Sequence, residues 1–224
     1  RPFRHSPATN CRFVYIPDGH KATICRILVQ RVPHRGDCLP RMWRDAANII
    51  NLAERRLGII TIEDLASIGI NRRMANRLVQ NGTLRCIYRG TIFALGAAHL
   101  ELEAEVLAAS LALPHGWVSG STAAAYWGLR RVPRDRIQMT VQGTSLPRIA
   151  NMRIRRTRFE SPDVVETISG GRISSPAQAI FEIAGEVDDR ILKSVTDDAL
   201  HRHLVTSTQL DKFGSQISRM GRDG

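Results

Sequence analysis

The segment 71–95, NRRMANRLVQNGTLRCIYRGTIFAL, constrains the fold more than any other part of this sequence. Its first ten residues place apolar side chains on one side of a helix, and Asn81-Gly82 then favours a helix end. Two short apolar runs follow, at residues 84–88 and 91–95, with Arg89-Gly90 between them. Runs of this length around a glycine-containing pair are typical of a β-hairpin. A short helix followed directly by a hairpin is therefore expected here.

Two further helices are expected before this segment. Apolar residues recur at helical spacing from 42 to 56, and Gly58 ends that pattern. The sequence Thr61-Ile-Glu-Asp64 has the form of a capping box, with Asp in place of Glu or Gln, and predicts a short helix through Ser67. Asn71 is a good N-cap for the third helix. Three helices and then a hairpin are the order of a winged helix-turn-helix.

The third helix has an outward face without any acidic side chain. At 3.6 residues per turn, its polar residues fall within an arc of about 140°, and its apolar residues, Met74 among them, are expected to pack inward. The outward residues are Arg72, Arg73, Asn76, Arg77 and Gln80. An ordinary surface helix mixes both signs of charge. Arginine, asparagine and glutamine instead pair with guanine and adenine edges in the major groove, which predicts DNA binding. Arg85 and Arg89 of the hairpin would then reach phosphate or the minor groove.

A second α+β region is expected after residue 98. Alternation of Ile137, Met139 and Val141 with polar residues predicts a half-buried strand over 136–142. Further strands are expected at 152–159 and 165–168, and helices at 100–113, 176–184 and 188–201. Another helix is expected to run from a cap at Ser119 or Ser121 through Trp127. The expected fold class is thus α+β, with an N-terminal winged helix-turn-helix followed by a mixed α+β domain. The expected domains are 42–98 and 99–224, preceded by an irregular basic segment, 1–41.

The positive charge is concentrated rather than spread evenly. The net charge is +11, and residues 130–158 alone hold nine arginines against one acid, Asp135. Alternation sends the arginines of the predicted strand at 152–159 to both of its faces, which predicts an edge strand. These residues, Arg153, Arg155, Arg156 and Arg158, form a candidate second basic site. A solvated edge, a second nucleic-acid contact and a surface for an acidic partner protein all fit this pattern.

Several classes of protein are disfavoured by the composition. No apolar run approaches the roughly 18 residues of a membrane span, and the N-terminus lacks the layout of a secretory signal, so a cytoplasmic protein is expected. Residues 1–41 show little periodicity, and the first methionine is Met42. We interpret them as upstream sequence outside the natural product, with a flexible basic arm as the alternative. Cys11, Cys25 and Cys38 lie too far apart for a typical zinc site, and no metal or cofactor is expected.

Catalysis is not expected either. The sequence has no glycine-rich phosphate loop and no paired metal-ligand motif. His201 and His203 lie at a predicted helix end, where cations are favourable in any case. Ser119 does not have the spacing of a nucleophile elbow.

Four segments resemble the AbiEi-type antitoxin family of type IV toxin–antitoxin systems. They are LASIGINRRMANRLVQNGTL, YRGTIFALGA, VSGSTAAAYWGL and GRISSPAQAIFEIA, and together the resemblance covers about residues 51–210. It implies an N-terminal winged helix that binds operator DNA and represses its own operon. It also implies a second domain that completes the antitoxin, and a nucleotidyltransferase-like toxin encoded alongside. By position, Arg72, Arg73, Asn76 and Arg77 match the DNA-facing helix of the family.

The leading hypothesis is therefore a cytoplasmic, double-stranded-DNA-binding repressor that acts as a type IV antitoxin and is not an enzyme. The same paired architecture also precedes an endonuclease-like domain of the very-short-patch-repair type. A DNA-targeting portion of such a protein is accordingly the first alternative. A module that binds an acidic partner instead of DNA is the second.

Overall fold

The computed structural model describes residues 39–88, 90–96, 99–129, 132–143, 146–157 and 163–220, with side chains from residue 46 to residue 216. All of these residues belong to one compact unit, Asp37–Gly224. The predictions made for residues 1–38, including Cys11, Cys25 and Cys38, lie outside the described residues, as do those for Arg89 and Arg158. The division into domains at residues 41 and 98 stays a prediction.

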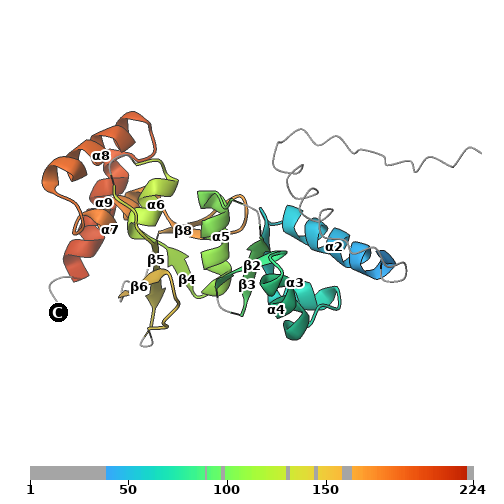
Figure 1. Ribbon diagram of the computed structural model, residues 1–224. Coiled ribbons are helices and arrows are strands. Elements are labelled where there is room, and N and C mark those ends of the chain that lie inside the picture. Colours follow the sequence, from blue (N-terminus) through green and yellow to red (C-terminus); the bar gives the residue numbers. More distant parts are fainter. Residues whose placement is uncertain are drawn as a thin grey trace, which may run out of the picture. The chain divides into compact units, whose positions relative to one another are not determined.

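The first part of the described chain has the topology of a winged helix (Figure 1). Its elements are α2 (Leu39–Glu54), β1 (Ile59–Thr61), α3 (Ile62–Ser67), α4 (Arg72–Gln80), β2 (Leu84–Tyr88) and β3 (Ile92–Leu95). The three strands form an antiparallel sheet in the order β1-β3-β2. The expected α+β class, with an N-terminal winged helix-turn-helix, is confirmed.

The helix starts that the capping residues predicted are also confirmed. Thr61 Oγ1 accepts a hydrogen bond from the Asp64 N–H at 3.1 Å, and Asp64 Oδ2 accepts one from the Thr61 N–H at 2.9 Å, which completes the capping box. Asn71 Oδ1 accepts a hydrogen bond from the Met74 N–H at 3.0 Å. Because each cap satisfies N–H groups that a helix start leaves unpaired, these bonds fix where α3 and α4 begin.

The winged helix differs from the sequence-based prediction at two places. Strand β1 was not predicted, and it pairs Ile59 with Ala94 and Ile60 with Phe93. Three residues are too few for alternation to reveal a strand, and all three are buried. In addition, α2 begins at Leu39, three residues before the predicted start.

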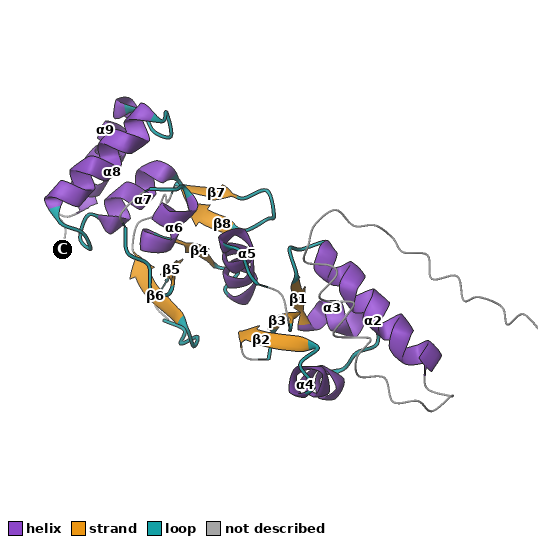
Figure 2. Ribbon diagram, turned by 45° about the horizontal axis from the view of Figure 1, so that its top comes forward, coloured by secondary structure: helices purple, strands orange, loops and turns teal. Residues whose placement is uncertain are grey.

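The second sheet has five strands in the order β6-β5-β4-β8-β7 (Figure 2). They are β4 (Gly116–Val118), β5 (Ile137–Gln142), β6 (Met152–Thr157), β7 (Val164–Glu166) and β8 (Arg172–Ser174). Strand β5 pairs in parallel with β6 and antiparallel with β4, so the sheet is mixed. Strand β6 lies at one edge of this sheet, as its arginines predicted.

Five helices belong to this part of the chain: α5 (Leu102–Ala112), α6 (Gly120–Tyr126), α7 (Pro176–Ile183), α8 (Asp189–His201) and α9 (Ser207–Met220). Helix α5 packs on the sheet face that carries Ile137 and Met139, in a core cluster that also contains Tyr88 and Ile92 of the winged helix. A second cluster joins α6, α7 and α8. The first cluster therefore joins α5 to the sheet, and the second joins the helices to one another.

The prediction of a half-buried strand over 136–142 is wrong. Gln138 is 2% exposed and Thr140 is 7% exposed, so both faces of β5 are buried. The second face is covered by α6, where the Gln138 N–H donates to Thr122 Oγ1 at 2.9 Å and the Ser121 N–H donates to Gln138 Oε1 at 3.1 Å. The alternation along β5 therefore distinguishes an apolar buried face from a hydrogen-bonded buried face. It does not distinguish a buried face from a solvent-exposed one.

Candidate nucleic-acid interface

Helix α4 packs through one side and exposes the other. Ala75 is 0% exposed, and Leu78 and Val79 are half-buried, so this side holds the helix against the rest of the fold. The five residues predicted to face outward are all exposed: Arg72, Arg73, Asn76, Arg77 and Gln80. The predicted amphipathic arrangement is therefore present, while contact of these residues with DNA stays a prediction.

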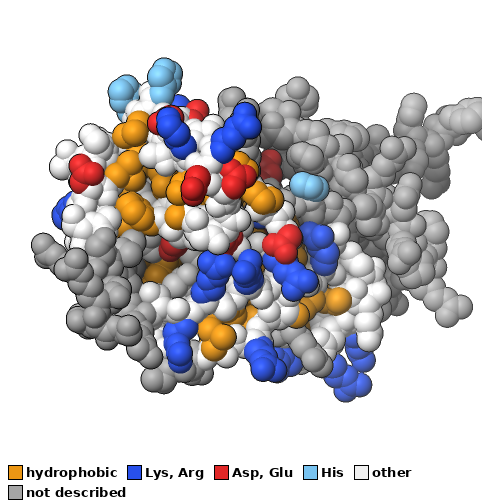
Figure 3. Space-filling model, turned by 90° about the vertical axis from the view of Figure 1, so that its left-hand side faces the viewer, with side chains coloured by type: hydrophobic (Ala, Val, Ile, Leu, Met, Phe, Trp, Pro, Cys, Tyr) orange, Lys and Arg blue, Asp and Glu red, His pale blue; other side chains and the backbone are white. Residues whose placement is uncertain are grey.

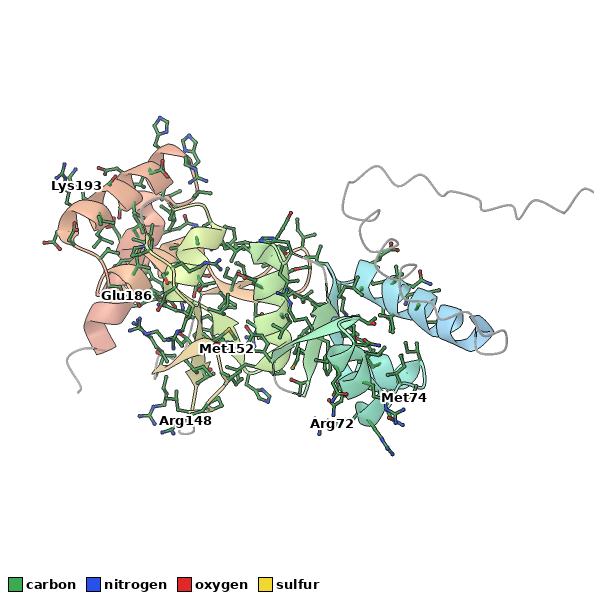
Figure 4. The ribbon with its side chains drawn as sticks, viewed as in Figure 1. Arg72, Met74, Arg148, Met152, Glu186 and Lys193 are labelled. Carbon is green, nitrogen blue, oxygen red and sulfur yellow. The ribbon has the colours of Figure 1, made fainter. Side chains whose placement is uncertain are left out.

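Met74 departs from the predicted arrangement. It is 37% exposed, so the expectation that it packs inward is wrong. On a helical wheel it lies only about 60° from Arg77, at the margin of the apolar side. Figure 4 labels Met74 and Arg72, which both belong to the first turn of α4. An apolar side chain thus borders the exposed polar face.

Arg72 makes a contact that the sequence did not predict. Its Nη2 donates a hydrogen bond to the carbonyl oxygen of Gly90 at 2.8 Å. Gly90 lies in the turn between β2 and β3, with a φ of 77° that favours glycine. The first residue of α4 is therefore bonded directly to the tip of the hairpin.

The arginines of α4 keep their charge unpaired within the described part of the chain. The ion pairs found there use other cations, such as Arg56, whose Nη1 lies 2.8 Å from Asp64 Oδ2. Asp64 thereby combines a capping role with charge neutralisation, at a site outside α4. The outward face of α4 consequently combines positive charge, exposure and hydrogen-bond donors, which is what a polyanion requires of its binding surface.

The hairpin that follows α4 supplies one described basic residue. Arg85 is exposed on β2, where it pairs with Ala94 of β3, and Arg89 lies outside the described residues. Tyr88, the last residue of β2 before the turn, is 5% exposed and pairs with Ile92 of β3. Burial raises the pKa of the Tyr88 hydroxyl to about 12, with the negative charge of Glu105 adding to the effect. The strand ends that flank the turn are therefore packed into the core.

The candidate second basic site on β6 has a different environment. Arg155 Nη2 lies 2.5 Å from Glu186 Oε1, and Glu186 Oε2 also accepts a hydrogen bond from Gln138 Nε2 at 3.2 Å. Arg153 and Arg156 are exposed, and Arg158 lies outside the described residues. On the face shown in Figure 3, Lys and Arg side chains lie beside Asp and Glu side chains. Part of the positive charge of β6 is thus neutralised within the fold.

A buried polar network next to this ion pair was missed by the sequence analysis. The carboxylate of Glu182 accepts hydrogen bonds from the Gly120 N–H at 2.7 Å, from the Ser174 hydroxyl at 2.9 Å and from Gln178 Nε2 at 2.7 Å. Burial raises the pKa of Glu182 above its ordinary value, and these hydrogen bonds oppose that shift. The spacing of four residues between Gln178 and Glu182 on α7 was the signal available in the sequence, whereas Ser174 lies on strand β8.

Within the described ranges, no group of His, Cys, Asp and Glu side chains is arranged to hold a metal ion. Likewise, none of the described helices is both long and apolar enough to cross a membrane.

Comparisons with known proteins match one segment of this chain to a family of regulators. Residues 49–91, which include all of α3 and α4, match the model of a family described as transcriptional regulator, AbiEi antitoxin. The resemblance inferred from the sequence is confirmed over this segment, and the family so described is one of regulators rather than enzymes. The crystal structure of the RV2827C protein from Mycobacterium tuberculosis is similar in fold, with a TM-score of 0.52, 19% identity, and coverage of 77% of this chain and 71% of that chain. None of the curated proteins matches this sequence.

Proposed function

We propose that this protein is a DNA-binding transcriptional repressor that acts as the antitoxin of a type IV toxin–antitoxin system. The observation that carries the proposal is the exposed, acid-free face of α4, in the segment that matches the AbiEi antitoxin regulators. In a helix-turn-helix the second helix enters the major groove, and here that helix is α4. The family resemblance supplies the antitoxin role and the nucleotidyltransferase-like toxin as a proposed partner.

Six residues of the interface have a proposed task in DNA binding. Arg73 and Arg77 would pair with guanine, and Asn76 and Gln80 would pair with adenine, because these side chains match the major-groove edges of those bases. Arg85 and Arg89 would contact phosphate from the hairpin, where they add affinity without sequence preference. No cofactor or catalytic step enters this function, and binding to an operator requires a cytoplasmic protein.

A gel shift with the upstream region of the gene, repeated at several salt concentrations, tests the proposal. The logarithm of the affinity should fall linearly with the logarithm of the salt concentration, and a scrambled duplex of equal length should bind more weakly. Arg89→Ala should weaken binding to both duplexes alike and reduce the salt slope by roughly one. If no duplex shifts even at low salt, the assignment of α4 as a recognition helix is wrong.

Repression and the antitoxin role need a second experiment. A reporter driven by the upstream region should be silenced by the wild-type protein and released by Arg77→Ala. A neighbouring reading frame for a nucleotidyltransferase should inhibit growth when it is expressed alone, and co-expression of this protein should restore growth. Failure of rescue with intact repression would favour a repressor without an antitoxin role.

A further inference from the structure

Arg72 begins α4 in an electrostatically unfavourable place. The N-terminus of a helix carries a partial positive charge, and the first turn of α4 holds two arginines and no acid. A bond to a carbonyl oxygen offsets this cost, since a charged donor makes a stronger hydrogen bond than a neutral one. The carbonyl that Arg72 uses belongs to Gly90, eighteen residues further along the chain.

The contact at Gly90 is close as well as polar. A Cβ atom added at Gly90 would lie 2.9 Å from Arg72 Nη2, so the guanidinium group lies directly against the glycine. The strand register also shifts between Cys86 and Tyr88, just before this turn. The end of the hairpin therefore has an irregular ladder, and the Arg72 bond ties it to α4.

We propose that Arg72 is a positioning residue that holds the tip of the wing, the β2–β3 hairpin of residues 84–95, against the first turn of α4. Helix and wing then meet DNA in a fixed relative geometry, with Arg72 acting through Gly90 rather than by reading a base. The effect of this link on DNA recognition rests on the proposed DNA-binding function. The link itself can be measured in the protein without DNA.

Hydrogen exchange in the free protein tests the link directly. Arg72→Ala should raise the exchange rate of amides in residues 84–95 about fivefold, as expected for the loss of one hydrogen bond that limits local opening. Arg73→Ala is the matched control, because Arg73 lies beside Arg72 in the same turn and makes no described bond to the hairpin. It should leave these amides unchanged.

Two glycine variants distinguish the effect of a clash with Arg72 from the effect of backbone strain at a positive φ. Gly90→Ala combines a positive φ with the contact to Arg72, whereas Gly82→Ala has a similar φ of 78° and no atom within 4 Å of the added Cβ. Gly90→Ala should therefore accelerate exchange at the wing tip as Arg72→Ala does, beyond the effect of Gly82→Ala. The double variant Arg72→Ala/Gly90→Ala should add little to either single change, since both break the same link.

Footprinting on the upstream duplex measures the consequence for binding. Arg72→Ala should lose protection where the wing lies and retain the base preferences of α4, while Arg73→Ala should lose a base preference and keep the wing protection. The proposal is overturned if Arg72→Ala leaves exchange at residues 84–95 unchanged, or if it relaxes preference at one base pair with the wing protection intact. Absence of DNA binding by the wild-type protein would instead refute the proposed function, and the exchange result would still decide the link.

Discussion

Helix α4 and strand β6 are both rich in arginine, and the fold gives their charges opposite surroundings. In α4 the exposed arginines meet no described carboxylate, and the one that is tied down is bonded to a carbonyl oxygen. In β6 the sheet brings Arg155 to Glu186, beside the buried polar network of Glu182. Local sequence places arginine equally in both, so composition alone does not distinguish a binding face from a structural contact. The contrast predicts that changes at α4 alter DNA affinity and that changes beside β6 alter stability.

The largest effect should come from Glu182, at the structural end of this contrast. Glu182→Ala leaves the Gly120 N–H, the Ser174 hydroxyl and the Gln178 amide without their acceptor, and should lower the free energy of unfolding by about 3 kcal/mol. Urea unfolding measures this loss. Glu166→Ala, which removes an exposed carboxylate from β7, is the control and should change stability little. Equal losses for the two variants would contradict the role of the network.

The same carboxyl group should give stability a pH dependence of known sign. Because the pKa of Glu182 is raised in the folded state, its contribution is fully present below the unfolded value of 4.5 and is lost as the pH rises through the raised value. Relative to Glu182→Gln, the wild-type protein should therefore lose stability as the pH increases. Unfolding of both proteins at several pH values between about 4.5 and 7.5 measures this difference. A difference that grows in the opposite direction would show that the carboxyl group is preferentially ionised in the fold.

At the binding end of the contrast, Arg77→Ala or Arg73→Ala should cost about 1–3 kcal/mol of affinity for the operator if the side chain pairs with a guanine. Neither change should alter the free energy of unfolding by more than about 0.5 kcal/mol, since both residues are exposed. Competition with duplexes substituted at single base pairs would show whether the loss is confined to one position. A uniform loss over all duplexes would make the residue a phosphate contact instead.

The parts of this molecule that the sequence predicts are those set by neighbours along the chain. Thr61 and Asn71 cap helices through bonds that span three residues, and the amphipathic face of α4 follows from a nine-residue wheel. Strand β1 depends on pairing with β3, over thirty residues away in sequence, and it is too short to show a pattern of its own.

The missed features of the candidate site have the same origin. The bond from Arg72 to Gly90 and the ion pair from Arg155 to Glu186 join distant segments, so no local pattern announces them. The sequence pattern of β5 predicts that Gln138 faces solvent, because the strand sequence gives no sign of helix α6, which covers this residue. The sequence therefore predicts which residues lie at the interface. The residues to which they are bonded are known only from the three-dimensional structure.

Arg155 tests how much of the arginine content of β6 is structural. Arg155→Ala leaves a largely buried oxygen of Glu186 without its cation and should lower the free energy of unfolding by about 1 kcal/mol, a modest figure because the arginine is partly exposed. Operator affinity should change by less than about twofold, as expected for a residue outside the interface. Pairing the change with Glu186→Gln should recover part of the lost stability, because the second change removes the unpaired charge.

Arg153 should show the smallest effect, and it decides whether the contrast holds. It is exposed on β6, so Arg153→Ala should change unfolding by less than about 0.5 kcal/mol. If β6 is a solvated edge, the change should also leave the salt slope of DNA binding unaltered, because no phosphate contact is lost. A slope reduced by about one would instead make β6 a second contact for nucleic acid. In that case β6 would bind a polyanion through its exposed arginines although Glu186 neutralises Arg155. The exposure of a basic side chain would then decide nucleic-acid binding more than the presence of an acidic residue nearby.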